Sequence, residues 1–436
     1  MRPRPALAVL LALAWAPSSF AQERWHAQGE VREEVTTTGR STSDLDPDGR
    51  VLGTDAVATR LRLGGAVSLR LGERWSLKLK GVADARAGHD RRLDETRLDS
   101  ELVLRDLYLN GPLGPFQLSL GRKIIRWSNG YAFTPAGLLD PQRDPSDPQD
   151  RLGRTRGRDL VQLDCYLGRH TLTLAVASPG DVVSGSSDPD GLVALRHHVA
   201  LGRLELAAAG GVRPAGRDVA TFGFNYTVGD RVAIHGEVAG SRGSDALFPR
   251  SILPGHSNRL FAGDLLAPLR ADDRAAVLRY LLGLNYTFDN GLNLIAEFYR
   301  TDEGLDAREW DAFTAQSTLS RSLYDGGTFA PVFSGRSLPE INLLQAMQFL
   351  RRGGVRRNYG FLRAARSQAR GRLQATALAL VSLDDRSFVV VPEVSFTPSR
   401  RLLTYVRGAV FGGGRSTEFG SLPTGPSLSV GAVLSF

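Results

Sequence analysis

Positively charged side chains recur at spacings of two, or multiples of two, in two neighbouring stretches of the sequence. Arg60, Arg62 and Arg70 lie in the first stretch, and Lys78 and Lys80 lie in the second. Side chains two residues apart lie on the same face of a β-strand. Guanidinium and ammonium groups on one face attract anions, so the pattern predicts a cationic ladder that selects anionic solutes. The other interpretation that remains open is a hydrated surface on which these charges pair with carboxylates.

Further charged residues alternate with apolar neighbours and are expected on the same side of their strands as the ladder: Arg196, Arg279, Arg407, Glu237 and Glu297. Because acidic residues share this side, the two signs nearly balance there. Arg122, Lys123 and Arg126, within 121–127, are a second cationic group and are expected to form the cationic wall of a constriction made by the loop that follows.

Catalytic and metal-binding patterns are scarce in this sequence. The one cysteine, Cys165, excludes a disulfide framework and a Cys-rich metal site. No Gly-x-Ser-x-Gly or His-Glu-x-x-His motif is present. His197 and His198 would face opposite sides of a strand, whereas His235 and Glu237 share a face and would make either an acid–base pair or an ordinary polar contact. We therefore predict no enzyme, no metal site, no cofactor and, with a net charge of only +8, no nucleic-acid partner.

The first 22 residues have the pattern of a secretory signal peptide. Arg2 and Arg4 precede an apolar stretch over 6–16, and small residues flank Phe20 before the expected cleavage site near Ala21. The apolar stretch is too short for a membrane-spanning helix. The sequence therefore predicts an exported chain whose mature part is a single domain over 23–436.

Alternating hydrophobicity with a period of two dominates the mature part of the 436-residue chain. In the last stretch, Leu428, Val430 and Leu434 alternate with serine and glycine up to the terminal Phe436. This alternation is typical of strands with one apolar and one polar face. Eighteen such segments are expected: 24–38, 56–71, 74–86, 98–110, 115–127, 156–167, 169–178, 191–200, 203–212, 217–228, 231–243, 274–288, 291–302, 355–368, 371–384, 387–397, 400–411 and 425–436.

Three properties of these segments favour a membrane barrel over a soluble sheet. The segments are longer than soluble strands usually are. Tight turns alternate with long connections along the chain, and aromatic residues cluster near the strand ends. The sheet must also close, because an open sheet edge is not tolerated in hydrocarbon. We therefore predict an all-β fold, a transmembrane antiparallel β-barrel of 16–18 strands with long extracellular loops. Aromatic residues expected to form interfacial girdles are Trp75, Phe116, Trp127, Tyr226, Phe288, Phe396 and Phe436.

Two long connections have compositions of their own. The loop 128–155 contains four prolines and four aspartates, and such a stiffened loop is expected to fold into the lumen as a constriction. The alternatives are an ordinary exposed loop and, although the spacing does not match a calcium loop, a Ca²⁺ site. The connection 303–354 is expected to be an external loop, in which 341–352 forms either a short helix or the top of a strand.

The signal peptide, the alternating strands and the terminal Phe436 resemble Gram-negative outer-membrane β-barrels over the whole mature chain. Locally, 104–109, 120–123 and 127–131 resemble alginate-export-like and related uncharacterised porin-like barrels, although Ser128 stands where such proteins often have glycine. The resemblance implies passive passage of a solute, outer-membrane lipid as the surroundings, and recognition of Phe436 by the barrel-assembly machinery.

The resulting functional prediction is a porin-like channel in the bacterial outer membrane. It would pass small hydrophilic solutes, anionic or saccharide, by passive diffusion through a charged lumen. The alternative is a non-conducting structural or adhesin barrel, and an outer-membrane enzyme is less favoured because motifs for catalysis are missing from the sequence.

Overall fold

The computed structural model describes most of the chain beyond its first 23 residues. The predicted signal peptide, 1–22, lies outside the described part. The described residues are 24–39, 43–46, 51, 55–90, 95–141, 143–151, 153, 155–178, 191–213, 218–243, 246–249, 266–268, 276–327, 329–331, 335–351, 353–368 and 371–436.

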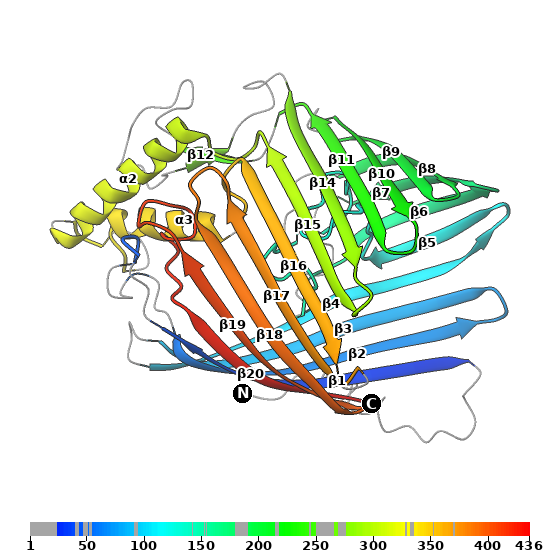
Figure 1. Ribbon diagram of the computed structural model, residues 1–436, viewed down its shortest axis with the longest axis horizontal. Helices are drawn as coiled ribbons and strands as arrows, with labels where there is room; N and C mark the ends of the chain where they lie inside the picture. Colours follow the sequence, from blue (N-terminus) through cyan, green and yellow to red (C-terminus); the bar gives the residue numbers. More distant parts are fainter. Residues whose placement is uncertain are drawn as a thin grey trace.

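Eighteen strands form one closed antiparallel sheet (Figure 1). Each strand of this sheet pairs with the next one along the chain, and β1 pairs with β20 with Glu30 opposite Ser435, which closes the barrel. The predicted fold class is confirmed, at the upper end of the expected strand number. The strands are β1 (Trp25–Thr38), β2 (Asp55–Leu71), β3 (Trp75–Asp90), β4 (Glu95–Leu113), β5 (Phe116–Lys123), β6 (Arg158–Leu167), β7 (His170–Ala177), β8 (Leu192–Leu201), β9 (Leu204–Val212), β10 (Val219–Val228), β11 (Val232–Ser241), β14 (Val277–Thr287), β15 (Leu292–Thr301), β16 (Asn358–Gln368), β17 (Leu373–Ser382), β18 (Phe388–Ser399), β19 (Leu402–Gly412) and β20 (Ser427–Ser435).

The alternation in the sequence becomes the two faces of the barrel wall. On β14, Leu278, Leu282 and Leu284 are exposed on the outside, whereas Val277 and Leu281 are buried inside. The same pattern recurs along the other strands, so large apolar side chains cover much of the outer surface. Among the described helices, none combines the length and apolar character needed to cross a membrane.

The two ends of the barrel differ in their connections. At one end, which we call the turn end, tight turns contain glycines with positive φ, such as Gly72 (69°) and Gly202 (66°). At the opposite end, the loop end, the connections are long. Exposed aromatic residues gather at the turn end as expected for a girdle: Phe116, Tyr226, Phe288, Phe396 and Phe436. The prediction for Trp127 is wrong, because its ring is only 7% exposed and lies beside Arg196 inside the barrel.

Two helices and a small hairpin cover part of the loop end (Figure 1). Helix α3 (Leu338–Arg351) decides the open question over 341–352 in favour of a helix, and α2 (Ala307–Asp325) precedes it. Asp306 and Glu309 form a capping box that satisfies backbone N–H groups at the start of α2. Strands β12 (Leu247–Pro249) and β13 (Leu266–Pro268) make the hairpin, and Phe248 packs with both helices in one apolar cluster.

A buried carboxyl group joins three segments at the loop end. Glu418, between β19 and β20, is fully buried and accepts hydrogen bonds from the Tyr359 hydroxyl (2.7 Å) and the Val355 N–H (3.3 Å). Its own N–H donates to Asp385 (2.8 Å), and the Arg356 guanidinium is also near. Burial raises the pKa of Glu418 to about 7, against the opposing effect of the hydrogen bonds.

The chain leaves the barrel wall earlier than the sequence indicates. Strand β5 ends at Lys123, so the predicted strand 115–127 is four residues too long, and Arg126 belongs to the following loop. As a result, β4 pairs with β5 only from Leu107 onward. Over residues 95–104, β4 pairs with β3 on one edge, and no strand in the described part of the chain pairs with its other edge.

Candidate solute path

The segment 128–136 of the long loop is bound to two carboxylates of the barrel wall. Glu237 on β11 accepts hydrogen bonds from the Ser128 hydroxyl (2.8 Å) and the N–H groups of Asn129, Gly130 (3.2 Å) and Ala136 (3.0 Å). Buried carboxylates are stable when several donors surround them in this way. This part of the loop is therefore fixed to the inner face of the sheet.

Glu297 on β15 holds the next two residues of the loop. It accepts from the N–H groups of Tyr131 (2.5 Å) and Ala132 (2.9 Å), and His235 lies 2.9 Å from it. The sequence left two roles open for His235, an acid–base pair or an ordinary polar contact. In the structure, His235 makes a polar contact inside the barrel, and its partner is Glu297.

Apolar packing strengthens the attachment along the same wall. The Phe133 ring stacks on Tyr299 with centroids 4.2 Å apart and also contacts Tyr359. Inward-facing apolar residues of β14–β18, including Phe361 and Leu380, complete this cluster. We call this side, where the loop packs on β11 and β14–β18, the packed wall.

The segment 147–151 of the same loop is held by charges from other strands. The Arg151 carbonyl accepts from Arg32 on β1 (2.5 Å) and from Arg62 on β2 (3.3 Å). Asp150 pairs with Arg105 on β4 (3.0 Å), and Asp147 lies 3.7 Å from Arg407 on β19. Because these strands and the packed wall lie on different sides of the barrel, the loop crosses its interior.

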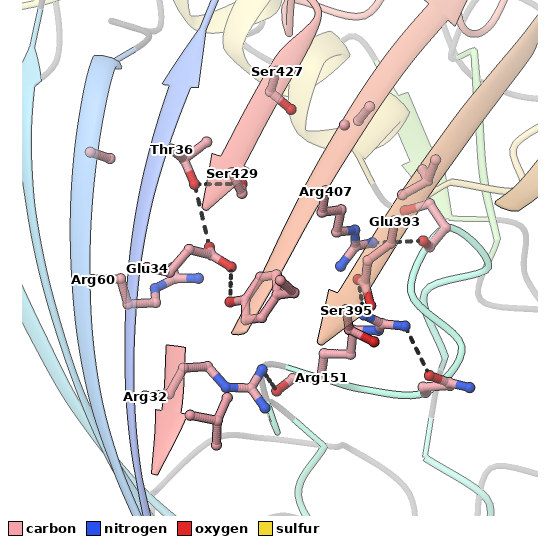
Figure 2. A pocket seen from close by; sticks show the side chains of 18 of the residues that line it. Arg32, Glu34, Thr36, Arg60, Arg151, Glu393, Ser395, Arg407, Ser427 and Ser429 are labelled. Carbon is pink, nitrogen blue, oxygen red and sulfur yellow. Dashed lines mark hydrogen bonds and ion pairs between the residues drawn. The ribbon is translucent and has the colours of Figure 1, made fainter. Parts of the chain in front are cut away.

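Two cavities remain beside this charged segment. The loop-end cavity, of about 470 Å³, is lined by Thr36, Ser427 and other residues toward the loop end (Figure 2). The turn-end cavity, of about 800 Å³, is lined by Gln28, Ser435 and other residues toward the turn end. We call the side formed by β1–β4 and β18–β20, which borders these cavities, the arginine wall.

Cationic groups and hydroxyl groups dominate the polar lining of the loop-end cavity. Figure 2 shows Arg32, Arg60, Arg151 and Arg407 around it, together with several serines. Glu34 is engaged by the Tyr405 hydroxyl (2.6 Å). The arrangement suits a solute that carries an acid group and hydrogen-bonding oxygens.

Burial shifts the pKa of several residues of this loop, among them Asp140 and Arg151. It raises the pKa of Asp140 to about 6, although the N–H groups of Trp127 and Ser128 donate to that carboxylate. It also lowers the pKa of Arg151, and the neighbouring Arg407 acts in the same direction. A guanidinium remains charged despite such a shift, so Arg151 stays a cation at neutral pH.

The predicted path residues fall into three groups. Those that line the two cavities are Arg60, Arg407, Arg62, Lys80 and Arg126. Those that hold the loop are Glu237 and Glu297. Those engaged elsewhere are Lys78 (beside the Tyr108 ring), Arg122 (bidentate to Asp159), Lys123 (bonded to Ser119 and Gln162), Arg196 (over Trp127), Arg279 (3.5 Å from Glu303) and Arg70, which is exposed near the turn end.

Three important residues of the site were not singled out from the sequence. Arg32 lies two residues from Glu30 and from Glu34, so the alternation of β1 was a usable signal. Arg105 falls at a register irregularity between β3 and β4, and Arg151 lies in the loop itself. Periodicity predicts the direction of a side chain only inside a regular strand.

Comparisons with known proteins show a likeness in fold. No family model and no curated protein matches the sequence. Among solved structures, the chain is similar to OccK5 (OpdH) of Pseudomonas aeruginosa, with 11% identity and a TM-score of 0.51 over 95% of this chain and 99% of that one. It is also similar to OccAB1 of Acinetobacter baumannii, with 6% identity and a TM-score of 0.56 over 96% and 99% of the two chains. The porin-like barrel fold is thereby confirmed.

Proposed function

We propose that this chain is an outer-membrane channel that lets small hydrophilic anions diffuse passively along the arginine wall. The observation that carries the proposal is the pair of cavities on the two sides of segment 147–151, one toward each end of the barrel. Loop 128–155 acts as the constriction between them, and the apolar outer surface is the face toward outer-membrane lipid. Phe436, which is bonded through its backbone to Gly29 at the closure of the barrel, serves as the recognition signal for the assembly machinery.

The cationic ladder contains fewer residues in this proposal than in the sequence-based prediction. Arg60 borders the loop-end cavity, whereas Arg62 and Lys80 border the turn-end cavity. These three groups therefore lie along one route from end to end. Arg60 is 3.2 Å from Asp84, so part of its charge is balanced by the wall.

Planar-bilayer recordings under a KCl gradient test the proposal. We expect discrete ohmic steps and a reversal potential that favours Cl⁻, because fixed cations near a narrow passage attract anions. The double variant Arg60→Ala with Arg62→Ala should lose most of this preference. The matched control is Arg169→Ala with Arg203→Ala, which removes two exposed arginines of turn-end turns.

Two results would contradict the proposal. A purified, folded barrel that shows no conductance would favour the structural or adhesin alternative. An unchanged reversal potential in the Arg60/Arg62 double variant would leave a channel but show that these two arginines do not set its preference for Cl⁻.

A further inference from the structure

The two cavities have three lining residues in common: Arg32, Gln149 and Arg151. Two of the three belong to the loop and one belongs to β1. A solute that passes from one cavity to the other along the arginine wall must therefore pass these side chains. The short stretch 149–151 and Arg32 on β1 therefore lie between the two cavities on this route.

The backbone of this stretch is fixed by hydrogen bonds. The Arg151 side chain, in contrast, forms an ion pair with one carboxylate among the described residues, that of Glu393. The Arg151 carbonyl accepts from Arg32 and Arg62, and its N–H donates to Asp147 (3.2 Å). The Arg151 guanidinium pairs with Glu393 on β18 and donates to the Gln149 side chain (3.2 Å). Loss of the pair with Glu393 would therefore free the guanidinium without releasing the backbone.

Through its pair with Glu393, the Arg151 guanidinium bridges the space between the loop and β18, beside the residues that the two cavities share. The Glu393 side chain is only 8% exposed and that of Arg151 is 26% exposed, so the pair lies at the surface of the cavity and not in bulk water. Figure 2 shows that Arg151 reaches Glu393 across the cavity edge, with Arg407 nearby. An ion pair with a buried carboxylate is screened little by solvent, so it holds the long arginine side chain in one position.

We propose that Arg151 is an anion-exchange gate: its pair with Glu393 closes the passage between the two cavities, and the acid group of an incoming solute opens it by replacing Glu393 on the guanidinium. This inference rests on the proposed channel function and adds a binding site and a means of regulation to it. The ligand is the carboxylate, or another oxyanion, of a small solute. Neither bond making nor proton transfer is needed, because one anion replaces another on the same cation.

The surrounding charges favour such an exchange. Arg32, Arg60, Arg86 and Arg407 line the same cavity as Arg151, so an anion that enters meets five guanidinium groups. The two carboxylates that line this cavity already have partners. Glu34 accepts a hydrogen bond from the Tyr405 hydroxyl, and Glu393 pairs with Arg151. The incoming acid group therefore gains several cationic neighbours at the moment when Glu393 loses one.

Single-channel recording of Glu393→Gln tests the gate with acetate as the probe. The glutamine keeps the size of the side chain but removes the charge that holds Arg151. We expect the open fraction in KCl alone to rise by up to about fivefold, the order of effect that loss of one partly exposed ion pair has on a two-state equilibrium. Acetate should raise the open fraction of the wild-type channel and leave that of Glu393→Gln unchanged.

A charge exchange and a distant variant keep the test decisive. The combination Arg151→Glu with Glu393→Arg restores an ion pair and should return the open fraction toward the wild-type value. Glu95→Gln, at an exposed position on β4, should behave as the wild type does.

The outcomes separate the gate from the channel. If the wild-type protein conducts and Glu393→Gln has the same open fraction and the same response to acetate, the gate is wrong and the channel stands. If wild type and all variants are silent in folded form, the channel function itself is wrong, and the gate falls with it.

Discussion

The packed wall and the arginine wall enclose the same loop but hold it by different means. On the packed wall, the loop is fixed by two buried carboxylates and by aromatic stacking around Phe133. On the arginine wall, the loop is held by guanidinium groups that border the two cavities. Apolar contacts and satisfied buried hydrogen bonds leave no room for a solute, whereas charged contacts at a cavity surface exchange with ions.

In the proposed channel, this difference is what makes a wide barrel selective. A closed sheet of this many strands encloses more space than its own side chains fill. With the loop packed on one wall, the two cavities lie along the other. The charge of the proposed route is then set by the arginine wall and by the loop residues that border the cavities, and not by the average charge of the lumen.

The largest effect is expected when the loop is released from the packed wall. Glu237→Ala removes the acceptor of one hydroxyl and three N–H groups, so the loop should leave the wall and the single-channel conductance should rise severalfold. Stability should fall by about 3–5 kcal/mol, because buried donors lose a charged partner. Denaturant unfolding measures the second effect.

Glu237→Gln provides the matched comparison for that variant. It keeps an acceptor oxygen at the same place and should show a smaller rise in conductance. A conductance of Glu237→Ala equal to that of the wild-type protein would show that the packed wall does not determine the width of the route.

A second prediction concerns the aromatic contacts of the packed wall. Phe133→Ala removes the ring that stacks on Tyr299 and should lower the free energy of unfolding by about 3 kcal/mol, as truncation of a buried phenylalanine usually does. Leu102→Ala is the control, since Leu102 is 60% exposed on the outer side of β4. Equal losses for the two variants, measured by denaturant unfolding, would argue against a packed interior.

The third prediction is a pH dependence at the loop end of the packed wall. Glu418 in the folded protein has a pKa of about 7, above its ordinary value of 4.5, so the folded state binds this proton more tightly than the unfolded chain does. The stabilisation is complete below about pH 4.5 and is lost as the pH rises through about 7, with a total of at most about 3 kcal/mol.

Protease protection of the segment 413–422, measured from about pH 5 to about pH 8, reports this loss. Glu418→Gln should remove most of the dependence, because the amide does not titrate. Protection that increases with pH in the wild-type protein would reverse the sign and contradict the assignment.

The smallest effect is expected at Arg126, a loop residue that faces the arginine wall across the turn-end cavity. This residue is exposed and borders the turn-end cavity, so Arg126→Gln should reduce the preference for Cl⁻ less than the Arg60/Arg62 double variant does. The reduction should be clear in dilute KCl and vanish at about 1 M, where the Debye length is about 3 Å. Reversal potentials at two salt concentrations give the comparison.

Much of the wall could be predicted from the sequence because strands impose a strict period. The eighteen expected segments correspond one to one with the barrel strands, and the alternation on β14 gave the correct faces. The limits of β5 could not be predicted, since 124–127 continues the apolar pattern after the chain has turned inward.

The division of the lumen into two walls was beyond a sequence-based prediction. Tyr359, Phe361 and Leu380 face inward, where polar residues are expected, because a loop distant in sequence covers them. Likewise, Arg122 is a cation by type but is already neutralised by Asp159. Both facts depend on contacts between segments far apart in the chain, which periodicity does not contain.

The short length of β5 has a consequence for how deeply the barrel is immersed. Residues 95–104 of β4 have one edge without a strand partner in the described part of the chain, and hydrocarbon does not tolerate unpaired peptide groups. For the proposed outer-membrane channel, we therefore expect the acyl-chain boundary on this flank to lie on the turn-end side of residue 104. The β3–β4 ribbon above that level would then stand among hydrated headgroups, at a height set by the early end of β5.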